Sequence, residues 1–144
     1  MKPIALASDH AGYILKELIK SFLQKNGYST KDYGTHSDKR ADYADFVHPL
    51  AFAIEDGKHE YGVVICGSGN GVSITANKHQ GVRSALSWTP EIARLSREHN
   101  DANVLALPAR FIDEETAMES VLIFLNTRFE GGRHIERVNK IRIQ

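Results

Sequence analysis

The fold is decided by the stretch Tyr61-Gly62-Val63-Val64-Ile65-Cys66-Gly67-Ser68-Gly69-Asn70-Gly71-Val72-Ser73. Its first half is a short apolar run rich in β-branched residues, which is typical of a buried parallel strand. Three glycines spaced by two follow the run, and a helical pattern starts directly after them. The stretch therefore predicts a strand, a tight turn and a helix N-terminus, in that order.

A turn of this kind is suited to holding an anion. Helix N-termini offer free N–H groups and a positive dipole end, and glycines let the backbone approach a ligand closely. Cys66, the only cysteine in the chain, is the last residue before the turn. Because a helix N-terminus favours the thiolate form of cysteine, we expect Cys66 to be a catalytic base. The alternative is a small, inert, buried cysteine.

Nucleotide and hydrolase motifs fit the turn poorly. A phosphate loop requires a lysine after its last glycine, where this chain has Val72. A dinucleotide fingerprint requires Gly-x-Gly-x-x-Gly and an acidic residue further on, whereas residues 80–89 contain no acidic side chain. A serine hydrolase centred on Ser68 would lack the Gly-x-Ser-x-Gly elbow.

The composition excludes several classes of protein. A length of 144 residues predicts a single domain, residues 1–144. Lysine plus arginine equals aspartate plus glutamate at 18 each, so nothing favours nucleic acid or an anionic membrane as a partner. One cysteine excludes an internal disulfide and fits a reducing cytoplasm. The seven scattered histidines lack the spacing of a metal site.

The pattern along the chain alternates strands with helices. Apolar runs predict five strands, at residues 4–7, 28–33, 61–65, 82–87 and 104–107. Helical periodicity predicts helices between them, one capped by Thr89 and one that starts at Asp113, and a last short helix at residues 133–143. Pro49 predicts a kink or break near His48. The predicted fold class is α/β, a Rossmann-like three-layer sandwich with a five-stranded parallel sheet and helices on both faces.

Polar residues follow three of these strands. Asp9 and His10 come after the first, Cys66 opens the glycine turn, and Arg110 comes after the fifth. Ligands of such folds collect outside the carboxyl ends of the strands, so we expect these residues on one edge of the sheet. Taken alone, Asp9 can equally be a helix cap and His10 a solvated side chain.

Two further groups could carry chemistry. His99, with Asn100 at the end of a predicted helix, is either a general acid or base or a helix-capping histidine. Arg133 and Arg137 are four residues apart, with His134 between them. Two guanidinium groups and an imidazole suit a phosphate dianion, although charge runs are usually solvated faces.

Five motifs, in order along essentially the whole chain, together resemble ribose-5-phosphate isomerase type B, in the wider family that includes galactose-6-phosphate isomerase subunits. They are residues 8–12 (Ser-Asp-His-Ala-Gly), 66–71 (Cys-Gly-Ser-Gly-Asn-Gly), 76–78 (Ala-Asn-Lys), 96–103 (Ser-Arg-Glu-His-Asn-Asp-Ala-Asn) and 130–134 (Glu-Gly-Gly-Arg-His). Two positions differ from the family's usual residues, Pro108 in place of glycine and Ala44 in place of proline.

The resemblance implies interconversion of ribose 5-phosphate and ribulose 5-phosphate without metal or cofactor. It implies that Cys66 moves the proton between C2 and C1, that Ser68 helps shift the hydroxyl proton, and that His99 opens the sugar ring. The remaining implied substrate contacts are the anion hole of Gly67, Gly69, Asn70 and Gly71, the sugar contacts of Asp9 and Asn100, and the phosphate contacts of His10, Arg110, Arg133 and Arg137, with His134 beside them.

The resemblance also implies a homodimer, sometimes paired into a tetramer, whose active site takes residues from both chains. We expect the helix at residues 133–143 to pack at that dimer interface. Alternatives are an isomerase of allose or galactose 6-phosphate, a phosphosugar-binding module without catalysis and, least supported by the motifs, a nucleotide-binding protein. Galactose-6-phosphate isomerase divides its site between two unlike subunits, whereas this chain carries Cys66, His99 and the arginines together, which favours the ribose enzyme.

Overall fold

The structure is a computed structural model that describes residues 1–143. Its centre is one sheet of five strands, all parallel, in the order β2-β1-β3-β5-β4. The strands are β1 (Ile4–Ser8), β2 (Thr30–Asp32), β3 (Gly62–Cys66), β4 (Ser84–Leu86) and β5 (Val104–Pro108). The predicted α/β class and the five-stranded parallel sheet are thereby confirmed.

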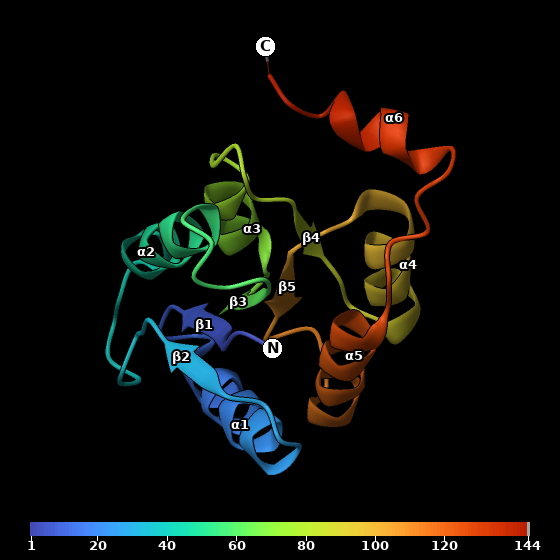
Figure 1. The fold of residues 1–144 in the computed structure, drawn as a ribbon. Helices are drawn as coiled ribbons and strands as arrows, with labels where there is room; N and C mark the ends of the chain where they lie inside the picture. Colours follow the sequence, from blue (N-terminus) through green and yellow to red (C-terminus); the bar gives the residue numbers. More distant parts are fainter. Residues whose placement is uncertain (144) are drawn as a thin grey trace.

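Helices cover both faces of the sheet and make it the middle of three layers (Figure 1). One face is covered by α1 (Tyr13–Lys25), α4 (Pro90–Asn100) and α5 (Glu114–Asn126), and the other by α2 (Tyr43–Glu55) and α3 (Asn70–Ala76). The short α6 (His134–Asn139) contacts α4. None of the described helices combines the length and the apolar composition needed to cross a bilayer.

Strand alternation explains why residues 61–65 form a continuous apolar run. Val63 and Ile65 point into the apolar cluster beneath α1 and α5, whereas Val64 and Cys66 belong to the cluster beneath α2 and α3. Both faces of β3 are therefore buried, as expected for a central parallel strand. The alternation also places Cys66 on the α2/α3 face of the sheet.

The helix boundaries follow the capping signals in the sequence. The Thr89 hydroxyl accepts a hydrogen bond from the N–H of Ile92 at 3.2 Å, and Asp113 accepts one from the N–H of Thr116 at 2.7 Å. These contacts satisfy N–H groups that have no partner inside a helix. The predicted starts of α4 and α5 are therefore confirmed.

Two predicted elements need correction. The break allowed for at Pro49 does not occur, and the alternative, a kink, stays a prediction. The helix α2 runs unbroken from Tyr43 to Glu55, because its apolar side, including Val47 and Leu50, is fully buried and offsets the lost hydrogen bond. The last helix is shorter than predicted, because α6 ends at Asn139 instead of residue 143. Only His134 is buried in α6, so little packing supports further turns.

A buried lysine ties α1 to β2. The Nζ of Lys16, whose side chain is inaccessible to solvent, lies 2.6 Å from Asp32 Oδ2, and Lys20 lies 2.7 Å from the same oxygen. Burial by itself raises the pKa of Asp32, but the hydrogen bonds from Lys16, Lys20 and the N–H of Gly34 outweigh it and hold that pKa below its ordinary value.

This network makes the stability of the fold depend on pH. A carboxyl group whose pKa is lower in the folded chain than in the unfolded chain stabilises the fold at any pH above its unfolded-chain pKa, which is near 3.9 for aspartate. This contribution to stability is lost as the pH falls through the lower pKa of the folded chain. We expect Asp32→Asn to cost about 3 kcal/mol near neutral pH, because Lys16 keeps its buried charge. Urea unfolding at pH 7 and at pH 3 checks this: the gap between the two proteins should narrow in acid, and a gap independent of pH would contradict it.

Candidate active site

The carboxyl ends of β1, β3 and β5 bring together three polar loops, as predicted. The N–H of Asp9 donates to the carbonyl of Ile65 at 3.3 Å, which joins the first loop to the second. The N–H of Arg110 donates to the carbonyl of Gly67 at 3.0 Å, and a Cβ at position 67 would stand 3.2 Å from its guanidinium Nη1. Pro108, which ends β5, therefore leaves Arg110 directly against the glycine turn.

The two polar residues after β1 are held by the backbone. Asp9 is buried, and its Oδ1 accepts a hydrogen bond from the N–H of Gly12 at 3.0 Å. His10 is half-buried, with its Nδ1 3.2 Å from the N–H nitrogen of Ala41. Asp9 thus closes the turn of residues 9–12 before α1, whose N-cap is Gly12 and has no side-chain cap, so the interpretation of Asp9 as the helix cap is wrong. The same contacts fix both side chains at the sheet edge, so a binding role stays open.

The glycine turn leads into α3 and leaves donors unused. Gly69 has a φ of +76°, a conformation that glycine adopts without strain. Ser68 is exposed, and its hydroxyl accepts a hydrogen bond from the N–H of Asn70 at 3.2 Å. Within residues 1–143, the N–H groups of Gly67, Ser68 and Gly69 donate to no acceptor. The turn can therefore offer several donors to an anion.

Tyr43 is a site residue that the sequence did not reveal. A Cβ at position 71 would stand 2.4 Å from the Tyr43 ring, so the ring packs directly on Gly71. The tyrosine begins α2 and is 40% exposed, which leaves a polar hydroxyl on an aromatic wall beside the turn. No local signal links residues 43 and 71, because only the packing of α2 against α3 brings them together.

Cys66 lies at the base of the turn and is 5% exposed. It belongs to the apolar cluster beneath α2 and α3, and its backbone carbonyl accepts a hydrogen bond from the N–H of Ala109 at 2.9 Å. The thiol is therefore confined at the end of a rigid strand. Its burial fits a packed cysteine as well as a base that meets substrate only at its tip.

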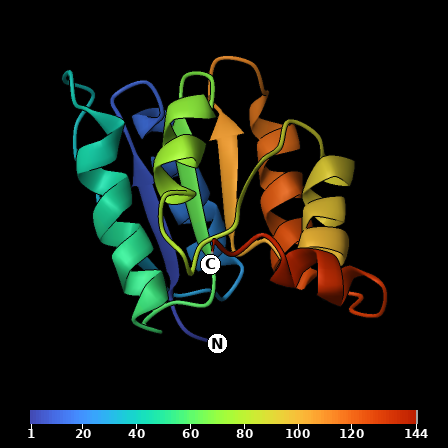
Figure 2. The ribbon, with the colours of Figure 1, turned by 90° about the horizontal axis from the view of Figure 1, so that it is seen from above.

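His99 and Asn100 lie at the opposite edge of the sheet. They end α4, which runs antiparallel to the strands and so ends where β5 begins. Arg83, just before β4, donates a hydrogen bond to the carbonyl of Asn100 at 3.2 Å. Figure 2 shows the same arrangement, with the arrowheads of the strands at one end and α6 at the other. A five-residue strand such as β3 spans about 13 Å. Within one chain, His99 therefore does not join Cys66.

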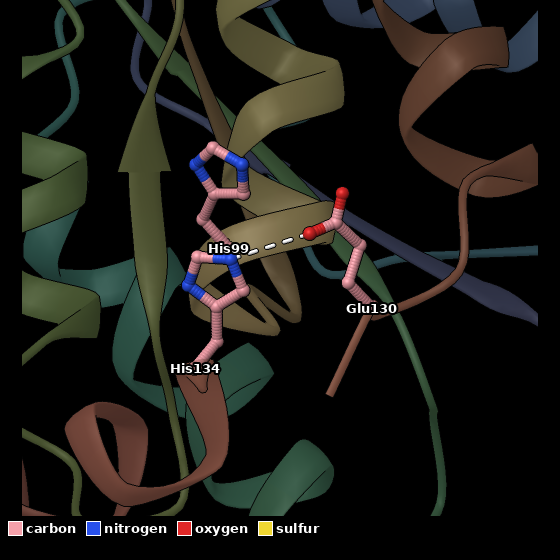
Figure 3. A group of neighbouring side chains, drawn as sticks. All are labelled: His99, Glu130 and His134. Carbon is pink, nitrogen blue, oxygen red and sulfur yellow. Dashed lines mark ion pairs between the residues drawn. The ribbon is translucent and has the colours of Figure 1, made fainter. Parts of the chain in front are cut away.

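The C-terminal basic residues accompany His99. Arg133 and Arg137 are exposed on and beside α6, whereas His134 is buried and stacks on the His99 ring (Figure 3). His134 Nε2 lies 3.2 Å from a carboxylate oxygen of Glu130. The arginines are free to meet a phosphate, but in the chain by itself the His134 ring is not.

A cavity of about 570 Å³ opens at this same edge, where the strands of the sheet begin and which is called the amino edge below. Asn100, Val138 and Arg142 are among the residues that line it, and neither Cys66 nor Asp9 does. The predicted site residues therefore form two groups: Asp9, His10, Cys66, the glycine turn and Arg110 at the carboxyl edge, and His99, Asn100, Arg133, His134 and Arg137 at the amino edge.

Comparison with known proteins assigns the chain to a family. A family model described as Ribose/Galactose Isomerase matches residues 4–141. Ribose-5-phosphate isomerase B of Escherichia coli is 43% identical over 141 residues, 98% of this chain and 95% of that protein.

Solved structures agree with this assignment. The crystal structure of a ribose 5-phosphate isomerase from Thermotoga maritima has a TM-score of 0.96 and 44% identity, and the match covers 98% of this chain and 97% of that one. A ribose-5-phosphate isomerase B from Mycoplasma genitalium with bound ribulose-5-phosphate has a TM-score of 0.91 and 39% identity, over 96% and 93% of the two chains. The protein is a sugar-phosphate isomerase, and it belongs to the ribose/galactose isomerase family.

Proposed function

We propose that the chain interconverts ribose 5-phosphate and ribulose 5-phosphate. The observation that carries the proposal is the position of Cys66 at the end of β3, directly before a glycine turn in which the N–H groups of residues 67–69 have no acceptor within residues 1–143. Moving a proton between neighbouring carbons needs a base and donors for the oxyanion that develops. The relatives named as ribose-5-phosphate isomerases support this choice of substrate.

In the proposed reaction the Cys66 thiolate takes the proton from C2 of the open-chain aldose. The electron pair of that C–H bond becomes the C1=C2 double bond, and the aldehyde oxygen becomes an enediolate oxygen held by the N–H groups of the turn. The thiol then returns the proton to C1 and becomes the thiolate again. The Ser68 hydroxyl gives its proton to the C1 oxygen and takes the proton of the C2 hydroxyl, so that C1 carries an alcohol, C2 becomes the ketone and Ser68 is restored. No atom is gained or lost.

The two edges of the sheet are the reason to propose a shared site. Ring opening by His99 and phosphate binding by Arg133 and Arg137 need groups about a strand length from Cys66 in one chain. A homodimer related by a two-fold axis could bring the amino edge of one copy to the carboxyl edge of the other. Asn100 would then reach the sugar, and His10 and Arg110 the phosphate, from opposite sides.

A hexose 6-phosphate isomerase is the alternative within the same class, because the matched family is described by both ribose and galactose. The purified protein should be assayed with ribose 5-phosphate, allose 6-phosphate and galactose 6-phosphate side by side. We expect the highest kcat/KM with ribose 5-phosphate. A higher kcat/KM with either hexose 6-phosphate would show that this hexose, and not ribose 5-phosphate, is the substrate. Binding of all three sugars without turnover would contradict the proposal that the protein is a catalyst.

A further inference from the structure

A pair of stacked histidines lies at the amino edge. The rings of His99 and His134 have their centroids 4.4 Å apart and their planes within 17° of each other (Figure 3). His134 is only 4% exposed, so its ring meets His99 instead of solvent. This burial separates His134 from the exposed arginines on either side of it, Arg133 and Arg137.

Glu130 contacts His134, the more buried histidine of the pair. Its Oε2 lies 3.2 Å from His134 Nε2, an atom that is fully buried and has no well-aligned hydrogen bond within residues 1–143. The carboxylate itself is about half exposed. The buried nitrogen thus faces a carboxylate that remains in contact with water, and this contact fixes the direction in which the His134 ring points.

The backbone around the pair is anchored to the end of α4. The N–H of Glu130 donates to the carbonyl of Glu98 at 3.1 Å. Arg97, which is 4% exposed, donates from Nε to the carbonyl of Thr127 at 3.1 Å and from Nη1 to that of Ala102 at 2.6 Å. The connection from α5 to α6 is therefore fastened to the same turn of helix that carries His99.

The His99 ring stacks on His134 and has no hydrogen bond of its own within residues 1–143. In the part of the chain that the structure describes, neither ring nitrogen of His99 makes a hydrogen bond to protein, and the side chain is half-buried. Its ring plane is fixed by stacking on His134, which leaves both nitrogens available to exchange protons with a ligand. An acid or base that must reach one oxygen gains from such fixed orientation.

The same three side chains could suggest a metal site, because their ligand atoms all lie within 4.8 Å of one another. The ring geometry favours stacking instead. A metal ion lies close to the plane of each imidazole that binds it, about 2 Å from the nitrogen. Two nearly parallel rings lying face to face would have to rotate before both could direct a nitrogen at one ion.

We propose that Glu130 and His134 form a positioning pair that orients the His99 imidazole for opening the sugar ring. The inference rests on the proposed function, because it assumes that His99 acts on the sugar. Glu130 fixes His134, His134 fixes the plane of His99, and neither of the two touches substrate. His134 is thereby given a role other than the phosphate contact expected from the sequence.

The first test compares three single variants with ribose 5-phosphate. His134→Ala should lower kcat/KM about tenfold, because a freely rotating His99 spends less time correctly oriented. His134→Phe keeps an aromatic plane and should recover most of that loss, and Glu130→Gln should cost about threefold. Glu136→Gln, the same change at an exposed acid of α6, is the matched control and should match the wild type. Full activity of His134→Ala would overturn the proposal.

The second test separates positioning from a structural role. If His134 acts only through His99, His134→Ala should lower kcat/KM by less than about twofold once His99→Ala is present. Losses that multiply in the double variant would overturn the proposal. Should His134→Ala fail to fold, the same cycle is run with Glu130→Gln, whose half-exposed side chain tolerates substitution.

A third measurement needs no turnover. The ring ¹⁵N chemical shifts of His99, recorded by NMR, should change in Glu130→Gln and stay constant in Glu136→Gln. Identical spectra in both variants would overturn the positioning pair. An inactive wild-type protein would instead contradict the proposed function, so the two failures can be told apart.

Discussion

Cys66→Ser is expected to lower kcat with ribose 5-phosphate by about 10³-fold, because a serine hydroxyl is a far weaker base toward a C–H bond and a positioned general base contributes about 10²–10⁴. Binding should persist, since the N–H groups of the glycine turn and Arg110 are unchanged. Turnover is measured as formation of ribulose 5-phosphate, and binding by calorimetry with ribose 5-phosphate.

The control for this variant is the stability of the fold. Serine is close to cysteine in volume but places a hydroxyl in the buried α2/α3 cluster, so the free energy of unfolding should fall by about 1–3 kcal/mol. A variant that remains folded and binds ribose 5-phosphate at the assay temperature, but has lost turnover, assigns the thiol to chemistry. If Cys66→Ser keeps activity within about threefold of the wild type, Cys66 is only a packed residue and the proposed mechanism is wrong.

Mixing two inactive variants should restore activity if the site is shared between chains. Suppose that one chain carries Cys66→Ser and the other His99→Asn, and that subunits exchange freely. Half of the dimers are then mixed, and each mixed dimer holds one site with both residues intact, so about a quarter of the wild-type activity should return. The measurement is the isomerase rate after co-expression with two different tags.

A pair of variants from the same edge is the matched control. Cys66 and Arg110 lie on the same edge of one chain, so mixing Cys66→Ser with Arg110→Ala should give only the average of the two parents. Recovery with the His99 pair alone would support two half-sites that meet across an interface. No recovery in either mixture, with dimers verified, would place the complete site within one chain.

Local signals in the sequence were enough for most of the fold. A strand buried on both faces requires an unbroken apolar run, so β3 was recognisable from residues 61–65. Thr89 and Asp113 marked helix starts because a capping side chain bonds to N–H groups two or three residues away. The carboxyl-edge cluster followed from topology alone, because parallel strands end on one side.

Local signals failed where packing outweighs propensity. Pro49 was expected to kink or break α2, and the break does not occur because the buried helix face stabilises the element. Residues 140–143 have suitable helical periodicity, yet α6 ends at Asn139, because His134 is its only buried side chain and little packing supports a longer helix. Tyr43 was missed as a neighbour of Gly71, since nothing in the sequence connects the two.

By itself, therefore, the sequence determined the α/β sheet, the glycine turn after Cys66 and the family, because strand burial, capping and motif order are written in neighbouring residues. The position of His99 a strand length from Cys66 also follows from the parallel topology, because a helix that connects two parallel strands ends where the next strand begins. Only the tertiary structure decided that His134 faces His99 and Glu130, because that contact depends on how the segment after α5 packs against α4, and no spacing along the chain encodes that packing.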